Sequence, residues 1–211
     1  VIINGEKLMP NKDIIIEFEP DKNDYASQLL IQKTKRGEYF ALSLIPSEKP
    51  DENQKKLKQE IVFVVDCSGS MSGWPLEQAV NMIKYSLEKL NEEDYFQIIQ
   101  FSNTAKKFSR EPVAVTSDNK RNARAYLSEL KSSGGTEMIS GIKAALNYPI
   151  SERERIVVFI TDGYIGNEDE VLKEVYANIG KVKILSFVVG NSINSYLLKE
   201  LAIAGKGGVA Y

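Results

Sequence analysis

Residues 60–71 read EIVFVVDCSGSM, and this stretch decides the fold. Its first part, Glu60 to Asp66, is an almost continuous apolar run that is rich in valine and isoleucine. Such a run is typical of a parallel strand that is covered on both of its faces. The run closes with an aspartate and passes into a segment of serine and glycine, which predicts a tight turn. The stretch therefore predicts a buried strand whose carboxyl end carries polar side chains.

Similar apolar runs recur along the rest of the chain and alternate with segments of helical period. Arg155 to Asp162 (RIVVFITD) also ends in aspartate, and Tyr95 to Phe101 (YFQIIQF) and Val182 to Val189 (VKILSFVV) predict further strands. We interpret Val209 to Tyr211 as the start of a last strand. Strands that alternate with helices in this way are typical of a mainly parallel sheet.

Helical periodicity is clearest between residues 75 and 90. Apolar residues recur there at spacings of four and three, and Pro75 suits the first turn of a helix. Thr116 to Asn119 offer several N-caps for a second helix. Three more segments complete the predicted helices, namely Met138 to Leu146, Glu168 to Ile179 and Ser195 to Ala204. The predicted fold class is α/β, with a doubly wound, mostly parallel sheet flanked by helices.

Residues 1–59 have a different character and predict a small N-terminal antiparallel β appendage. Three short strand candidates, separated by Pro, Asn, Asp and Gly, lie at Asp13 to Glu19, Leu29 to Lys35 and Glu38 to Leu44. Pro46 to Gln59 is polar and charged and contains proline, as is typical of a linker. We therefore expect a β-rich segment with its linker at residues 1–59 and one main domain at residues 60–211.

Charge and hydropathy argue against a nucleic-acid partner and against a membrane-spanning helix. The chain holds 27 Lys and Arg residues against 29 Asp and Glu residues, so its net charge of -2 provides no basic field for nucleic acid. The longest apolar runs are Ile61 to Val65 and Ile156 to Ile160. Both are far shorter than the roughly 20 apolar residues that a helix needs to cross a bilayer.

The histidine and cysteine content narrows the chemistry further. Because histidine is absent, a Ser-His-Asp triad, an HExxH zinc site and a histidine general base are all excluded. The single cysteine, Cys67, excludes an internal disulfide and a four-cysteine zinc site. We expect Cys67 in the core rather than as a nucleophile, because it ends a buried run and alternates away from Asp66. Any metal must therefore be bound by oxygen.

Polar side chains gather around the end of the first predicted strand. Alternation places Asp66, Ser68 and Ser70 on one side of the turn, at the edge of an open α/β sheet where ligands bind. Further oxygens come from Gly134 to Glu137 (GGTE), before a helix, and from Thr161 to Gly163 (TDG), after a central strand. Hard oxygen ligands in a near-octahedral arrangement suit Mg²⁺ or Mn²⁺.

The order of these residues resembles a known metal site. The D-x-S-x-S run from Asp66 to Ser70, the threonine after two glycines at Thr136 and the aspartate at Asp162 resemble the metal-ion-dependent adhesion site (MIDAS) of von Willebrand factor A domains. The resemblance covers roughly residues 60–211. It implies a module that is not an enzyme and that binds another protein through one Mg²⁺, with Mn²⁺ or Ca²⁺ as alternatives.

The resemblance also implies a role for each residue of the pattern, and all five positions match it. Ser68 and Ser70 would coordinate the metal directly, whereas Asp66, Thr136 and Asp162 would act directly or through water. One coordination position is then left for water or for a Glu or Asp side chain that the partner protein supplies.

Within this family, the chain resembles bacterial proteins and inter-alpha-trypsin inhibitor heavy chains, in which a VIT domain precedes the A domain. The stretches that carry this similarity are Pro10 to Asp13, Gly134 to Met138 (GGTEM) and Asn194 to Gly208. The similarity implies that residues 1–59 are the trailing edge of a VIT domain or a connector to one. It also favours an extracellular or cell-envelope location.

Other interpretations stay open on the sequence alone. Asp66 and Asp162 also suit a role as turn caps at strand ends, and the two serines suit a role as helix caps. A phosphoryl-transfer enzyme of haloacid-dehalogenase type also uses Mg²⁺ and a strand-end aspartate, but it requires a second aspartate where Ser68 stands. A structural spacer with a vestigial site is a third alternative. Trp74 and Tyr164 either flank a docking surface or pack beneath the loops.

Overall fold

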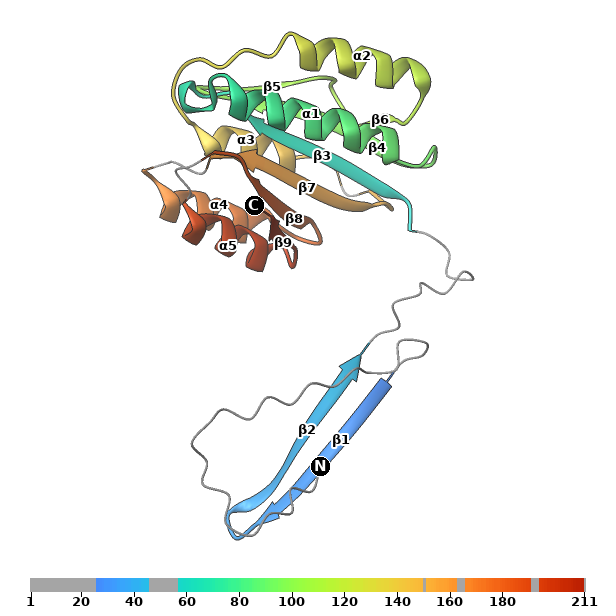
Figure 1. Cartoon of the computed structure of the whole chain (residues 1–211), viewed down its shortest axis with the longest axis vertical. Coiled ribbons are helices and arrows are strands. Elements are labelled where there is room, and N and C mark those ends of the chain that lie inside the picture. Colours follow the sequence, from blue (N-terminus) through green and yellow to red (C-terminus); the bar gives the residue numbers. More distant parts are fainter. Residues whose placement is uncertain (1–25, 46–56, 150, 163–165, 191–193, 211) are drawn as a thin grey trace, which may run out of the picture. The chain divides into compact units, whose positions relative to one another are not determined.

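The computed structural model describes residues 26–45, 57–149, 151–162, 166–190 and 194–210. The chain divides into two compact units, with the boundary between Lys56 and Leu57 (Figure 1). The predicted strand at Asp13 to Glu19 and most of the predicted linker at Pro46 to Gln59 lie outside the described residues.

The described part of the first unit is a β-hairpin. Strand β1 (Ala26–Thr34) pairs with strand β2 (Gly37–Ile45) in antiparallel register. Both strands contain β-branched residues, and β2 also contains Tyr39 and Phe40; residues of both kinds favour extended backbone. The hairpin confirms the two strands predicted at Leu29 to Lys35 and Glu38 to Leu44 and the antiparallel character of the appendage.

The second unit is built on a seven-stranded sheet in the order β5-β4-β3-β7-β8-β9, with β6 beside β4. The parallel strands are β3 (Gln59–Asp66), β4 (Tyr95–Phe101), β7 (Glu154–Thr161), β8 (Lys183–Val188) and β9 (Gly208–Ala210). These bounds confirm the predicted strands to within one or two residues at most ends. Strand β7 stops at Thr161, so Asp162 is the first residue after the strand.

Two short strands were not predicted. Strands β5 (Ala105–Lys107) and β6 (Val113–Ala114) both pair with β4 in antiparallel register. Their sequences, AKK and VA, are too short to show an alternating pattern. They pair with β4 on the side that faces away from β3. Without them, this side of β4 would be an open sheet edge.

The strand order contains one reversal of direction. From β3 the chain moves to β4 on one side, and it later crosses to β7 on the other side of β3. In open α/β sheets, ligands bind beyond the carboxyl ends of the strands at such a reversal. Asp66 ends β3 and Asp162 follows β7, so both aspartates stand at this point.

Helices cover both faces of the sheet (Figure 1). One face carries α1 (Trp74–Lys89) and α2 (Ser117–Ser128), and the other carries α3 (Met138–Leu146), α4 (Glu168–Asn178) and α5 (Ser195–Ala204). All five helices were predicted. The predicted N-cap of α2 is also observed, because the Thr116 hydroxyl accepts a hydrogen bond from the Asn119 amide (3.2 Å).

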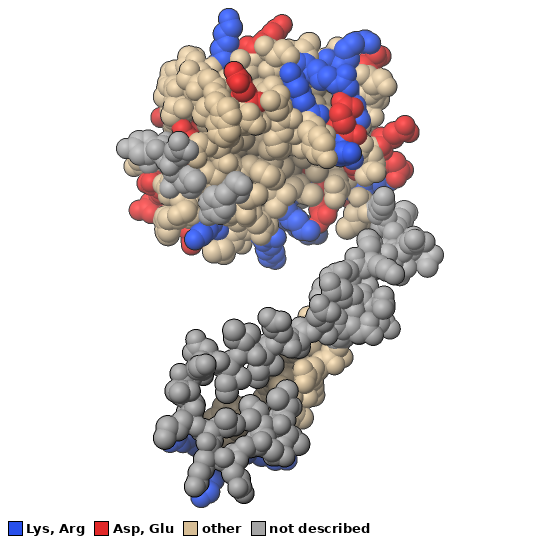
Figure 2. Space-filling model, viewed as in Figure 1, with Lys and Arg blue, Asp and Glu red and all other residues tan. Residues whose placement is uncertain are grey.

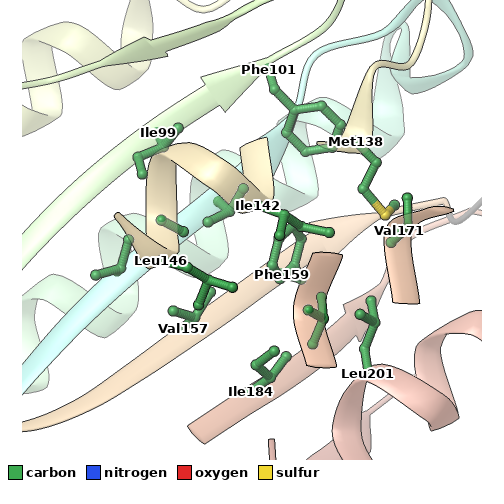
Figure 3. Packing of buried hydrophobic residues seen from close by; sticks show 14 of the residues in the cluster. Ile99, Phe101, Met138, Ile142, Leu146, Val157, Phe159, Val171, Ile184 and Leu201 are labelled. Atoms are coloured by element: carbon green, nitrogen blue, oxygen red, sulfur yellow. The ribbon is translucent and has the colours of Figure 1, made fainter. Parts of the chain in front are cut away.

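Strand β3 anchors the two hydrophobic cores. Val62 and Val64 face the core under α3, α4 and α5, whereas Ile61, Phe63 and Val65 face the core under α1 and α2. Figure 3 shows the first core, with side chains from the strands and from α3, α4 and α5 in contact. Each such buried side chain contributes about 1.5–3 kcal/mol to stability. The position of Asp66 at the end of β3 is therefore fixed by packing on both faces.

The described surface agrees with the balanced composition. Figure 2 shows acidic and basic side chains interspersed over the visible face of the second unit. None of the helices that the structure describes combines the length and the hydrophobicity needed to span a membrane.

Candidate metal centre

The carboxyl ends of the parallel strands form one edge of the sheet, which we call the carboxyl edge. Asp66 is the most buried acid of this carboxyl edge, with an exposed fraction of 0%. Its Oδ1 accepts a hydrogen bond from the Ser68 amide (2.8 Å), and its Oδ2 accepts one from the Thr161 hydroxyl (2.7 Å). Burial raises the pKa of Asp66 above its ordinary value of 3.8; the hydrogen bonds from Ser68 and Thr161 lower this pKa, and the Asp162 carboxylate raises it. The carboxylate of Asp66 is thus held in one orientation at an electrostatic cost.

The serine turn, residues 67–71, follows Asp66 directly. The Cys67 amide donates to the Phe101 carbonyl of β4 (2.7 Å), and residues Gly69–Met71 form one turn of 3-10 helix. This backbone path brings Ser68 Oγ and Ser70 Oγ to 3.0 Å from each other. Adjacent oxygen ligands of an octahedral Mg²⁺ also lie about 3 Å apart, because the metal–oxygen distance is about 2.1 Å. The two hydroxyls therefore have the spacing of neighbouring metal ligands.

The threonine loop, residues 133–137, lies against the serine turn. The Gly69 amide donates to the Gly134 carbonyl (3.0 Å), and the Ser133 amide donates to the Cys67 carbonyl (2.8 Å). These two bonds place Thr136, which is partly exposed, two residues beyond the contact with the serine turn. The contacts that fix the loop are made by the backbone of residues around Thr136.

Asp162 is the second acid of this edge. It follows β7 directly and is buried, with 6% of its surface exposed. It lies close enough for its charge to act on Asp66, since it contributes to the raised pKa of Asp66. Among the residues described, Asp66 forms no ion pair with Lys or Arg. A buried carboxylate that lies near a second carboxylate is an environment that a divalent cation would neutralise.

The donor set fits a hard cation. Carboxylate and hydroxyl oxygens are the ligands that Mg²⁺ and similar ions prefer. Within the described ranges, the structure holds no group of three or more His, Cys, Asp or Glu side chains that could bind a metal. A site here must therefore use hydroxyl groups beside the aspartates, and Ser68 and Ser70 supply them.

Two side chains at this edge were not among the predicted site residues. Thr161 donates to Asp66, and its position opposite the end of β3 depends on the pairing of β3 with β7, which the sequence does not reveal. Asn103 accepts a hydrogen bond from the Gly135 amide (2.7 Å). No sequence signal marks Asn103, because the residues it contacts lie 32 positions away.

The structure describes two of the three other residues that the sequence singled out. Cys67 is buried in the core as predicted, and burial together with the Asp66 charge raises the pKa of its thiol to about 12. Trp74 begins α1 with 61% of its surface exposed, so it does not pack beneath the loops. Tyr164 lies outside the described residues.

Sequence comparison places the second unit in a family. The family model of the von Willebrand factor type A domain matches residues 59–210. A von Willebrand factor A domain-containing protein of Dictyostelium discoideum is 28% identical over 203 residues, which cover 92% of this chain and 22% of that protein. Inter-alpha-trypsin inhibitor heavy chain H3 of Homo sapiens is 29% identical over 163 residues, which cover 71% of this chain and 18% of that protein. The chain thus spans less than a quarter of the length of these relatives.

Solved structures share the fold. A von Willebrand factor type A protein from Catenulispora acidiphila has a TM-score of 0.66 at 16% identity, covering 92% of this chain and 47% of that chain. Proximal thread matrix protein 1 from the mussel byssus, solved with a zinc-occupied MIDAS motif, has a TM-score of 0.56 at 19% identity. That match covers 72% of this chain and 41% of the mussel protein. Because the family model extends over most of the chain, this protein belongs to the family of von Willebrand factor type A domains.

Proposed function

We propose that the domain binds one Mg²⁺ at its carboxyl edge and uses the ion to bind an acidic side chain of another protein. The observation that carries this proposal is the pairing of the buried Asp66 carboxylate with two serine hydroxyls 3.0 Å apart. The arrangement has the oxygen chemistry and the spacing that an octahedral hard cation requires.

Each residue of the pattern has a proposed role in this site. Ser68 and Ser70 bind the metal directly, and Asp66, Thr136 and Asp162 bind it directly or through water. The metal supplies a positive charge with one coordination position open to a Glu or Asp carboxylate of the partner. Mn²⁺ and Ca²⁺ are alternative ions. Zinc occupies the MIDAS motif of the mussel protein, which supports divalent-metal binding at such a motif, although oxygen donors alone favour Mg²⁺ over zinc.

The proposal is a binding function rather than an enzymatic one. Phosphoryl transfer of the haloacid-dehalogenase type needs an acid two residues after the strand-end aspartate, and Ser68 stands there with its amide bonded to Asp66. The raised pKa of the Cys67 thiol also removes the one cysteine from nucleophilic chemistry. A spacer with a vestigial site is distinguished by its lack of response to divalent ions.

Calorimetric titration with Mg²⁺ tests the proposal. We expect one binding site in the wild-type protein and none in Asp66→Ala or Asp162→Ala. The matched control is Asp118→Ala, because Asp118 is an exposed aspartate in the first turn of α2, where its partner is Arg121. The control should bind Mg²⁺ as the wild type does. Unchanged binding in the Asp66 and Asp162 variants would refute the site.

Partner recognition is tested with the metal-loaded domain and a short peptide that contains a central glutamate. We expect peptide binding in Mg²⁺ that is lost in EDTA and lost when the glutamate is replaced by glutamine. Equal binding of the glutamate and glutamine peptides would remove the acidic side chain from the proposed mode of recognition.

The placement of this domain in a longer protein is also a proposal. We propose that residues 1–59 connect a VIT domain to the A domain at residues 60–211, as in inter-alpha-trypsin inhibitor heavy chains. The hairpin of β1 and β2 supports a separate β-rich segment there. A relative of this kind also favours an extracellular or cell-envelope location.

A further inference from the structure

We infer that Asn103 is a positioning residue, which holds the threonine loop in the geometry that the metal centre requires. Asn103 lies in the turn between β4 and β5 and is itself no candidate ligand. The inference rests on the proposed metal site, because it assigns to Asn103 the placement of Thr136 relative to Ser68 and Ser70.

The turn that contains Asn103 contacts the threonine loop on both sides of Thr136. The Gly135 amide donates to Asn103 Oδ1 (2.7 Å), and the Glu137 amide donates to the Ser102 carbonyl (2.7 Å). The residues immediately before and after Thr136 are therefore bound by two consecutive residues of one turn. Two such contacts restrict the backbone of Thr136 more than either contact does alone.

Asn103 also packs against Gly134, which links the loop to the serine turn. Gly134 has a φ of 80°, and a β-carbon at this position would lie 2.9 Å from Asn103 Nδ2. A side chain is thus disfavoured at Gly134 both by its backbone conformation and by the closeness of Asn103. The Gly134 carbonyl in turn accepts the hydrogen bond from Gly69 (3.0 Å). Gly134 therefore connects Asn103 to the turn that carries Ser68 and Ser70.

The contribution of Asn103 can be separated from the stability of the fold. The bond between Ser102 and Glu137 joins two backbone groups, so it survives replacement of any side chain in the turn. The bond from Gly135 depends on the Asn103 side chain, which is exposed. Truncation of an exposed side chain creates no cavity in the core. Its main effect should be a less ordered threonine loop.

Titration of Asn103 variants with Mg²⁺ tests the inference. We expect Asn103→Ala to weaken Mg²⁺ binding about 10-fold, as loss of an outer hydrogen-bond partner does at other metal sites. Asn103→Asp keeps the acceptor oxygen and should restore most of the affinity. The matched control is Asn119→Ala, which loses the bond from Asn119 Nδ2 to the Ala114 carbonyl (2.9 Å) beside the first residues of β4, at the opposite edge of the sheet. The control should keep wild-type affinity.

A second readout needs no metal. In the metal-free protein, we expect the Gly135 amide to exchange its hydrogen faster in Asn103→Ala than in the wild type, whereas the Glu137 amide changes less. Wild-type Mg²⁺ affinity in Asn103→Ala, or an equal loss in Asn119→Ala, would overturn the inference. If the wild type bound no Mg²⁺, the proposed function would fail, and unchanged exchange at Gly135 would then overturn the role of Asn103 independently.

Discussion

The central sheet buries acidic residues both at its carboxyl edge and at its amino edge, where the parallel strands begin. The two edges differ in the groups that compensate the acidic charge. At the amino edge, Glu60 accepts an ion-paired hydrogen bond from Arg155, and Asp94 accepts bonds from the Gln59 and Asn91 amides (3.0 and 2.9 Å). At the carboxyl edge, Asp66 lies near a second carboxylate and beside two serine hydroxyls.

This difference separates a structural acid from a candidate ligand. Burial alone does not distinguish the edges, because Asp94 and Asp66 are both almost fully buried. The distinguishing feature is compensation: the amino edge has an arginine within the protein, whereas the described carboxyl edge offers Asp66 no basic side chain. We therefore expect the free energy of unfolding to fall when the arginine of the amino edge is lost, and to rise when a divalent ion binds at the carboxyl edge.

The largest expected effect is on the amino edge. Arg155→Ala should lower the free energy of unfolding by about 3–5 kcal/mol, because it leaves the buried Glu60 without its positive partner. The Arg155 guanidinium also donates to the carbonyls of Tyr148 and Pro149 (3.1 and 2.7 Å), and these bonds are lost as well. Urea unfolding measures the change. Arg124→Ala, which breaks an exposed pair with Glu88, is the control and should cost about 0.2–1 kcal/mol. Equal costs for the two variants would contradict the contrast in burial.

The next effect is on the carboxyl edge. Mg²⁺ at 100 times its dissociation constant should raise the free energy of unfolding of the wild type by about 2.7 kcal/mol, because the ion binds only the folded protein. Asp66→Ala should show no such increase. Urea unfolding with Mg²⁺ and with EDTA measures the difference. An equal increase in Asp66→Ala would mean that the ion binds elsewhere.

A smaller effect concerns pH in the metal-free protein. Because the folded pKa of Asp66 is raised above its unfolded value of 3.8, the folded state binds this proton more tightly. The stability that protonated Asp66 contributes is fully present below pH 3.8 and is lost as pH rises through the folded pKa. Asp66→Asn carries no such charge, so its stability relative to the wild type should increase with pH over this window. Parallel urea midpoints for the two proteins in EDTA, from about pH 4 to about pH 8, would contradict the raised pKa.

The smallest expected effect concerns Cys67, whose thiol should not react in the folded protein. With its thiol buried and the pKa of that thiol raised to about 12, Cys67 should resist a thiol reagent at about pH 8 while the protein is folded. The same reagent in denaturant should label the thiol completely. Rapid labelling of the folded protein would show that the serine turn opens readily.

The two edges also differ in how well the sequence predicts them. The carboxyl edge was predictable because Asp66, Ser68 and Ser70 are close in the sequence and follow a strand with a strong apolar pattern. The amino edge was not, because Glu60 and Arg155 are 95 residues apart and meet only through the register of β3 and β7. In the same way, Asn103 belongs to a turn before a strand too short to predict, so its contact with the threonine loop required the three-dimensional structure.

The fold itself was largely predictable. The helices and the parallel strands follow from hydrophobic period and from turn residues, because each element carries its own pattern. Strands β5 and β6 are exceptions, since their strand conformation depends on pairing with β4 rather than on a pattern in their own residues.

The most direct test of the central claim is a crystal structure of the domain grown with Mn²⁺, with the anomalous signal of the metal recorded. We predict one peak at the carboxyl edge, within coordination distance of Ser68 Oγ and Ser70 Oγ, with at least one remaining ligand from water or from a carboxylate of another molecule. A crystal without an anomalous peak at this edge, or with its only peak at another surface, would contradict the claim that these loops share a metal ion.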